Sequence, residues 1–96
     1  MTTSLHIEHP ITAYETWKGA FDKFAPMRSA AGVRAHHIRR PVDDENFVVI
    51  DLDFDTAEEA EHFLQILRER VWAVRENSPA LAGEPRTSIL ETLDAG

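Results

Sequence analysis

Cysteine is absent from the 96 residues, so the chain forms no disulfide and offers no thiolate for catalysis or zinc binding. Long apolar runs are missing too, and none approaches the roughly 20 residues of a membrane-spanning helix. Positive charge is scarce, because 10 Lys and Arg stand against 17 Asp and Glu and give a formal net charge of −7. An acidic chain is poorly suited to a phosphate backbone or an anionic membrane. We therefore expect neither nucleic acid nor a membrane among its partners.

The start of the chain and its composition indicate the class of protein. Residues 1–4 lack the basic start and apolar middle of a signal peptide, and with the lack of cysteine this favours the cytoplasm. Apolar residues make up 43% and charged residues 28%, a balance typical of globular domains. A chain of this length has room for one hydrophobic core. We predict a single domain over residues 4–94.

Hydrophobic periodicity predicts six elements in the order β-α-β-β-α-β. The strands are expected at 5–9, 33–40, 47–54 and 86–93. The first helix follows a capping-box spacing at Thr12 and Glu15 and ends near Pro26, and the second begins with similar spacings in 55–59 and ends at Asn77. This order is typical of an α+β, ferredoxin-like fold, with a four-stranded antiparallel sheet and both helices on one face. Right-handed crossovers place the first and third strands in the centre.

The hairpin between the second and third strands predicts which side chains face away from the helices. One row of the third strand is uniformly apolar and should meet the helices: Val48, Ile50, Leu52 and Phe54. The other row faces away: Phe47, Val49, Asp51 and Asp53. Pairing Val33 and Ala35 with the apolar row sets these residues opposite one another: Arg34 and Asp53, His36 and Asp51, Ile38 and Val49, Arg40 and Phe47. A slip by one residue would bring Arg34 and His36 into the core.

The helix-free face of the sheet is thus expected to be apolar near the hairpin turn and charged farther away. Such a patch is large for a small monomer. We predict a homodimer that packs these faces together and encloses the charged end as a pocket. The candidate ligand-binding residues are His6, Glu8, Ile38, Phe47, Val49 and Asp53.

The candidate catalytic residues are His36, Asp51 and Arg34. Asp51 would hold one ring nitrogen of His36 and leave the other free as a general base, while Arg34 would stabilise developing negative charge. The alternative is that His36 and Asp51 form only a cross-strand ion pair, worth about 0.2–1 kcal/mol. His6, Glu8, His36 and Asp51 also offer metal-ligand chemistry. Nothing in their spacing demands a metal, so we expect neither a metal nor a cofactor.

Several segments resemble small uncharacterised bacterial proteins that are similar to the dimeric α+β barrel superfamily. They are Glu8 to Pro10, Trp17 to Asp22, Arg40 to Asp44 and Asp51 to Phe54. The superfamily includes cofactor-free antibiotic-biosynthesis monooxygenases, haem-degrading monooxygenases, muconolactone isomerases, polyketide cyclases and stress-response proteins. The resemblance implies two sheets facing each other across a dimer, with a cavity on the helix-free side.

The resemblance does not assign a catalytic residue. Antibiotic-biosynthesis monooxygenases typically carry a histidine followed by Ser-Pro in the helix after the third strand. Here His62 is followed by Phe63 and Leu64, so that signature is absent. The favoured reading is a cofactor-independent monooxygenase, isomerase or cyclase acting on a small planar organic substrate. The alternatives are a non-catalytic ligand-binding or stress-response dimer and a haem-binding relative, for which no axial histidine stands out.

Overall fold

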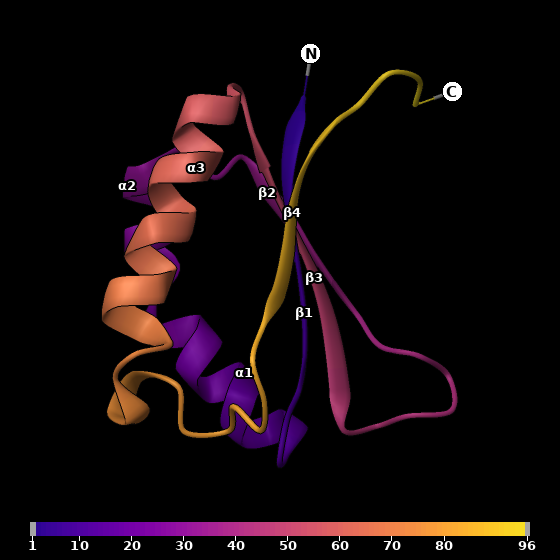
Figure 1. The fold of residues 1–96 in the computed structure, drawn as a ribbon, viewed down its shortest axis with the longest axis vertical. Coiled ribbons are helices and arrows are strands. Elements are labelled where there is room, and N and C mark those ends of the chain that lie inside the picture. The colour runs from indigo at the N-terminus through magenta and orange to yellow at the C-terminus, as the bar shows by residue number, and fades with distance from the viewer. Residues whose placement is uncertain (1, 96) are drawn as a thin grey trace.

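The computed structural model describes residues 2–95, which form one antiparallel sheet covered by helices on one side (Figure 1). The strands are β1 (Thr3–Pro10), β2 (Ala35–Arg39), β3 (Phe47–Phe54) and β4 (Arg86–Glu91). The helices are α1 (Tyr14–Lys23), α2 (Ala25–Ala31) and α3 (Ala57–Ile66), followed by a π-helical turn at Leu67–Val71 and a 3₁₀ turn at Arg75–Asn77. No helix among residues 2–95 has the length and apolar character needed to cross a membrane.

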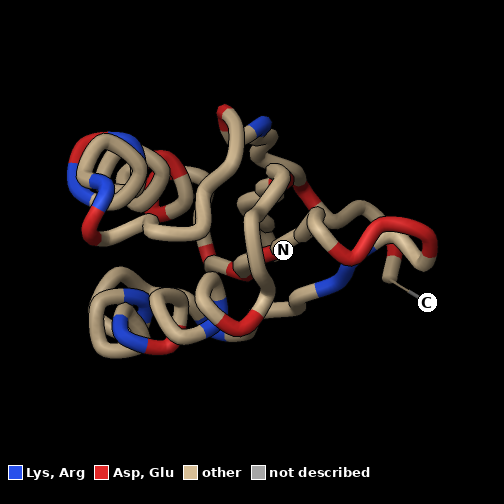
Figure 2. The backbone as a smooth tube through the Cα atoms, turned by 90° about the horizontal axis from the view of Figure 1, so that it is seen from below, with Lys and Arg blue, Asp and Glu red and all other residues tan. Residues whose placement is uncertain are grey.

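The sheet has the strand order β2-β3-β1-β4, so the first and third strands are central as predicted. β1 pairs antiparallel with both β3 and β4. Figure 1 shows α1, α2 and α3 on the same side, while the β2–β3 turn extends on the other. The acidic residues of that turn, which follow one another at 43–45, form a continuous red segment far from the helices in Figure 2. The predicted ferredoxin-like α+β fold is confirmed.

The first crossover differs from the expectation at both ends. The backbone at Ala13 caps α1 without any side-chain hydrogen bond, so the capping box expected at Thr12 and Glu15 does not form. Pro26 does not end the helical region but lies in the first turn of α2, where its missing N–H is not needed. The real end is Gly32, whose φ of 98° is the left-handed conformation that glycine adopts without strain.

The second crossover follows the prediction at its start and not at its end. The Thr56 side chain accepts from the Glu59 N–H at 3.2 Å, while the Glu59 carboxylate accepts from the Thr56 N–H at 3.3 Å. This is the expected capping box. The α-helix ends at Ile66, and the π-helical turn replaces the long continuation to Asn77. Residues after that turn leave the helix axis and cover the end of β1.

The hydrophobic core lies between the sheet and the helices. Its strand side chains alternate perfectly, with buried positions at every second residue of β1 and β3. The fully buried members with the largest side chains are Phe54, Phe63, Leu5, Leu52 and Val48. The rings of Phe54 and Phe63 pack with their centroids 5.9 Å apart, joining β3 to α3. The opposite row of each central strand is therefore free to carry polar groups.

The predicted register of β2 against β3 is wrong by one residue. Ala35, not Arg34, is the Cα partner of Asp53, and His36 lies opposite Leu52. The Arg34 N–H also donates to the Asp53 carbonyl, at 2.8 Å. Arg34 and Ala35 thus share one partner residue, which is the arrangement of a β-bulge.

The bulge explains why simple alternation fails in this strand. Val33 packs against the core, and Ile38 lies opposite the core residue Ile50, although regular alternation would put residues five apart on opposite faces. The extra residue of the bulge shifts the alternation by one position, so both side chains face the same side of the sheet. His36 then turns toward the helices, where its ring meets the edge of Phe21 at 5.2 Å, and remains exposed because β2 is an edge strand. Because His36 stays exposed, the free-energy cost expected for burying this polar side chain does not arise.

Candidate functional site

The helix-free face carries a connected polar network at its centre. His6 and Asp51 are direct partners on the central strands β1 and β3. The Nδ1 atom of His6 lies 2.9 Å from Asp51, and its Nε2 atom lies 3.2 Å from Glu8. Arg39 donates to the second oxygen of Asp51 at 2.6 Å. Asp51 is the most buried member, with 14% of its side chain exposed.

This network makes His6 a stronger base than a free histidine. The hydrogen bond to Asp51 is the largest cause of its raised pKa, Glu8 adds to it, and partial burial opposes both. The network therefore favours an imidazolium between two carboxylates. It can hold a charge in place but leaves no ring nitrogen of His6 free for a ligand.

The structure does not bring together the three predicted catalytic residues. Asp51 faces His37 across the sheet, whereas His36 lies on the helix-covered side. Burial lowers the pKa of His36, and the nearby positive charges of Arg28 and Lys18 lower it further, opposite to the rise that a partnering carboxylate would cause. Arg34 pairs with Asp55 at the surface, where both side chains are more than half exposed. The predicted His36–Asp51 pair is therefore wrong.

Five of the six predicted ligand-binding residues do lie on the helix-free face. His6 and Glu8 belong to the network, and Asp53 accepts a hydrogen bond from Ser4 at 2.7 Å. Phe47 and Val49 are half-buried within the sheet itself. Ile38 is the exception, because it pairs with Ile50 and faces the helices. No group of three or more residues suited to metal binding occurs within the described chain.

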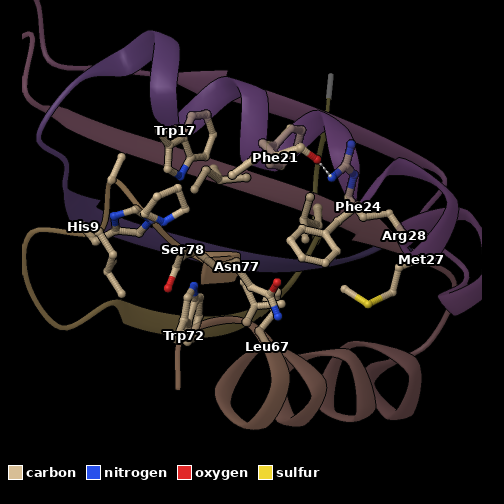
Figure 3. A pocket seen from close by; sticks show the side chains of 18 of the residues that line it. His9, Trp17, Phe21, Phe24, Met27, Arg28, Leu67, Trp72, Asn77 and Ser78 are labelled. Carbon is tan, nitrogen blue, oxygen red and sulfur yellow. Dashed lines mark hydrogen bonds between the residues drawn. The ribbon is translucent and has the colours of Figure 1, made fainter. Parts of the chain in front are cut away.

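A cavity of about 70 Å³ lies on the other side of the sheet, between the strands and the helices (Figure 3). It is partly open, and its walls come from β1, β3, all three helices and the loop that follows them. Most of its lining is apolar or aromatic. The polar or charged side chains on its walls are His9, Arg28, Asn77 and Ser78, together with the indole groups of Trp17 and Trp72.

The aromatic wall of the cavity comes from α1. Trp17 and Phe21 are one helical turn apart and stack with centroids 5.1 Å apart and planes 26° from parallel. Tyr14 adjoins Trp17 at 6.0 Å. Such flat faces suit a planar, polarisable ligand. The opposite wall includes Leu67 and Val71 of the π-helical turn.

Arg28 lies at one end of the cavity and His9 at the other, as Figure 3 shows. Only 7% of Arg28 is exposed, and its guanidinium donates to the Phe21 carbonyl and lies 3.6 Å from the centre of the Phe21 ring. Burial lowers its pKa. No carboxylate among residues 2–95 forms a salt bridge with it. A positive charge in this position favours electron-rich groups nearby.

A loop from the end of the helical layer closes the His9 end of the cavity. Ile11 forms a β-bridge with Leu81, and the Thr12 N–H donates to the Ala80 carbonyl at 2.9 Å. These bonds hold residues 77–81 against the end of β1. They place Asn77 and Ser78 in the cavity wall.

The cavity was not predicted, although the sequence carries one signal for it. Leu5 and Ile7 alternate toward the helices, and continuing the alternation by two residues puts His9 on the same side. Trp72 gave no comparable signal, because its place depends on the π-helical turn.

No protein-family model matches this sequence, and no curated protein is similar to it. Solved structures do share its fold. SnoaB, a cofactor-independent oxygenase from Streptomyces nogalater, superposes with a TM-score of 0.73 at 11% identity, over 98% of this chain and 95% of SnoaB. A protein of unknown function from Nitrosomonas europaea gives 0.71 at 13% identity, over 99% and 92% of the two chains. A dimeric ferredoxin-like protein from an uncultured marine organism gives 0.67 at 14%, over 99% and 97%.

Proposed function

We propose that this protein is a homodimeric enzyme that acts on a small planar organic substrate without a cofactor, in the manner of a monooxygenase. The observation that carries the proposal is the aromatic cavity between sheet and helices, with a histidine at one end and an arginine at the other. Oxygenation without a cofactor requires a substrate that can itself become electron-rich, a base and a pocket that excludes water. The likeness to SnoaB in fold supports this reading.

The size of the cavity limits the substrate. A cavity of about 150 Å³ holds benzene in a protein core, and the cavity here measures about 70 Å³ before any side chain moves. One aromatic ring therefore fits only with a modest opening of the partly open mouth. We propose a substrate with a single ring or a similarly small planar skeleton.

The helix-free face is the proposed dimer interface. The charged groups at its centre already pair with one another through His6, Asp51 and Arg39, so a second copy can cover this network without leaving its charges unpaired. Phe47 and Val49 supply apolar area on the same face. A solved structure of this fold is described as dimeric, which supports the same assembly here.

Tryptophan fluorescence tests the cavity directly, because the only two tryptophans in the chain, Trp17 and Trp72, both line it. We expect small phenols and hydroxyquinones to quench this fluorescence saturably, and some to be consumed with oxygen uptake. Phe21→Ala should weaken binding by removing the stacked wall. Val42→Ala, at a fully exposed position in the β2–β3 turn, is the control. If no compound of a broad aromatic panel alters the fluorescence, the cavity proposal is wrong.

Light scattering coupled to gel filtration tests the dimer. We expect about twice 10.9 kDa at micromolar concentration. Val49→Asp should shift the protein toward monomer, because it adds an unpaired charge to the interface. Val42→Asp makes the same chemical change at a fully exposed position in the β2–β3 turn and should not. A wild-type monomer would overturn this assembly.

A non-catalytic ligand-binding dimer is the second candidate. It is favoured by the separation of His36 from Asp51, which removes the one base–carboxylate pair that the sequence indicated. Saturable quenching without consumption of any bound compound would decide for this candidate. Oxygen uptake that depends on the cavity residues would decide against it.

A further inference from the structure

His9 is the one histidine that combines deep burial with an unused ring nitrogen. Only 3% of its surface is exposed. Its Nδ1 atom lies 3.0 Å from the Pro10 carbonyl oxygen. A carbonyl can only accept, so Nδ1 carries a hydrogen and donates. In the neutral ring this leaves Nε2 without a hydrogen and with its lone pair available.

The free nitrogen of His9 has no partner within the protein. No hydrogen bond reaches Nε2 from any group in residues 2–95. The described residues also contain no fully buried side-chain nitrogen or oxygen that lacks a partner. The Nε2 atom is therefore accessible from outside the protein, and His9 lines the cavity. An acceptor of a deeply buried residue that opens onto a cavity calls for a donor from a ligand or from water.

Further polar groups surround the same end of the cavity. In Figure 3 the indole nitrogens of Trp17 and Trp72 and the hydroxyl of Ser78 lie around the His9 ring. The Ser78 hydroxyl donates to the Val74 carbonyl at 3.2 Å, so its oxygen is left as an acceptor. Neither indole N–H has a hydrogen bond elsewhere in residues 2–95. One lone pair thus stands beside two free N–H donors.

We propose that His9 is the proton acceptor of this cavity and that the ligand it selects carries a phenol or enol hydroxyl. The inference rests on the proposed function and names its substrate class. The hydroxyl donates to Nε2. On transfer the O–H bond breaks and an Nε2–H bond forms, while the electron pair stays on the ligand oxygen. The indole N–H groups of Trp17 and Trp72 stabilise that oxygen as it becomes negative.

The environment of His9 keeps it ready for this role. Burial lowers its pKa, with the Pro10 hydrogen bond opposing in part, so the ring is neutral at neutral pH. Trp17 meets the ring edge-on at 6.3 Å and fixes its orientation, as does the hydrogen bond from Nδ1. His6, by contrast, has both of its nitrogens engaged by carboxylates and faces the other way.

A pair of probes that differ only at the hydroxyl tests the inference. 4-Nitrophenol and 4-nitrotoluene have nearly the same size and shape, but only the first can donate a hydrogen bond. Titrations followed by tryptophan fluorescence should show 4-nitrophenol binding about tenfold more tightly or better, as expected for one satisfied buried acceptor. His9→Phe should remove that preference and keep binding of 4-nitrotoluene. His62→Phe, on the exposed side of α3, should change neither.

A nitrogen NMR spectrum of the wild-type protein with labelled histidine gives a second readout that needs no variant in the site. The Nε2 signal of His9 should have the position of an unprotonated nitrogen and should move with 4-nitrophenol but not with 4-nitrotoluene. Equal binding of the two probes, or an unmoved Nε2 signal, would refute the role of His9 and leave the cavity function standing. Failure of both probes to bind would remove the cavity function as well.

Discussion

Two histidines of one strand, His6 and His9, show how differently the two faces of this sheet treat the same side chain. His6 faces away from the helices, contacts two carboxylates and has a raised pKa. His9 faces the cavity, contacts a carbonyl and an indole, and has a lowered pKa. Neighbouring charge governs the first and burial the second.

The two faces of the sheet differ in whether they leave a hydrogen-bonding group available for a ligand. On the helix-free face, His6 and Asp51 are hydrogen-bonded to each other. The second ring nitrogen of His6 contacts Glu8, and the second oxygen of Asp51 accepts from Arg39. On the helix-covered side, the Nε2 acceptor of His9 has no partner within residues 2–95 and opens onto the cavity. The charged cluster that the sequence indicated as a site has internal hydrogen-bond partners, and the lone histidine His9 is the candidate base.

The largest effect on the free energy of unfolding is expected from a substitution on the helix-covered face of the sheet. Leu52 is 2% exposed and faces the helices, while its neighbour Asp53 faces away. Leu52→Ala should lower the free energy of unfolding by about 2–5 kcal/mol. Asp53→Ala should cost about 1 kcal/mol, through the lost hydrogen bond from Ser4. Urea denaturation at one fixed protein concentration measures both, and similar losses would contradict the division between the faces.

Removal of the carboxylate at the centre of the network should have an intermediate effect. Asp51→Asn should lower the pKa of His6 toward its ordinary value, because Asp51 is the main cause of the rise. The loss in the free energy of unfolding should be about 1 kcal/mol. Proton NMR titration of the histidines follows the pKa, and Asp43→Asn in the exposed turn is the control. A His6 pKa unaffected by the change would mean that the network does not persist in solution.

The two histidines should contribute to stability in opposite directions as pH changes. For His6 the contribution is complete below the unfolded pKa of 6.5 and fades as pH rises through the higher folded value. For His9 it is complete above 6.5 and is lost as pH falls through the lower folded value. Unfolding free energies of His6→Gln and His9→Gln, measured against wild type from pH 5 to pH 8, should diverge with opposite slopes. Parallel slopes would contradict the assignment.

The smallest effect is expected at an ion pair outside both regions. Lys18 donates to Asp22 one turn later on the exposed surface of α1, at 2.7 Å. Lys18→Ala should cost about 0.3–0.5 kcal/mol, and the difference should disappear at high salt. A loss as large as that of Asp51→Asn would remove the distinction between a network at the centre of the sheet and an ordinary surface pair.

The sequence predicted the parts of the fold that depend on neighbours along the chain. β3 begins and ends where expected because its helix-facing row is uniformly apolar and alternates strictly with the other row. The capping box at Thr56 formed as expected, whereas the same spacing at Thr12 did not. The difference is tertiary, since the Thr12 N–H is held by the Ala80 carbonyl and Ile11 pairs with Leu81, far along the chain.

The candidate site was less predictable because it depends on two departures from regular structure. A bulge turned His36 toward the helices, and a π-helical turn directed the following residues over the end of β1. Neither has a sequence signature as strong as a capping box. The network on the helix-free face was predicted in part, since His6, Glu8 and Asp51 were placed there, but their partners were not.

The bulge at Arg34 and Ala35 also bears on how this chain can be compared with others. One extra residue there decides whether β2 shows Ala35, His37 and Arg39 on the helix-free face or Arg34, His36 and Ile38. A relative without the bulge would keep the same fold yet present the other set. Column-by-column alignment would then match side chains that lie on opposite surfaces. Equivalent residues in this strand therefore have to be identified from superposed structures. Insertion or deletion of a single codon is enough to change which side chains the strand presents on the helix-free face.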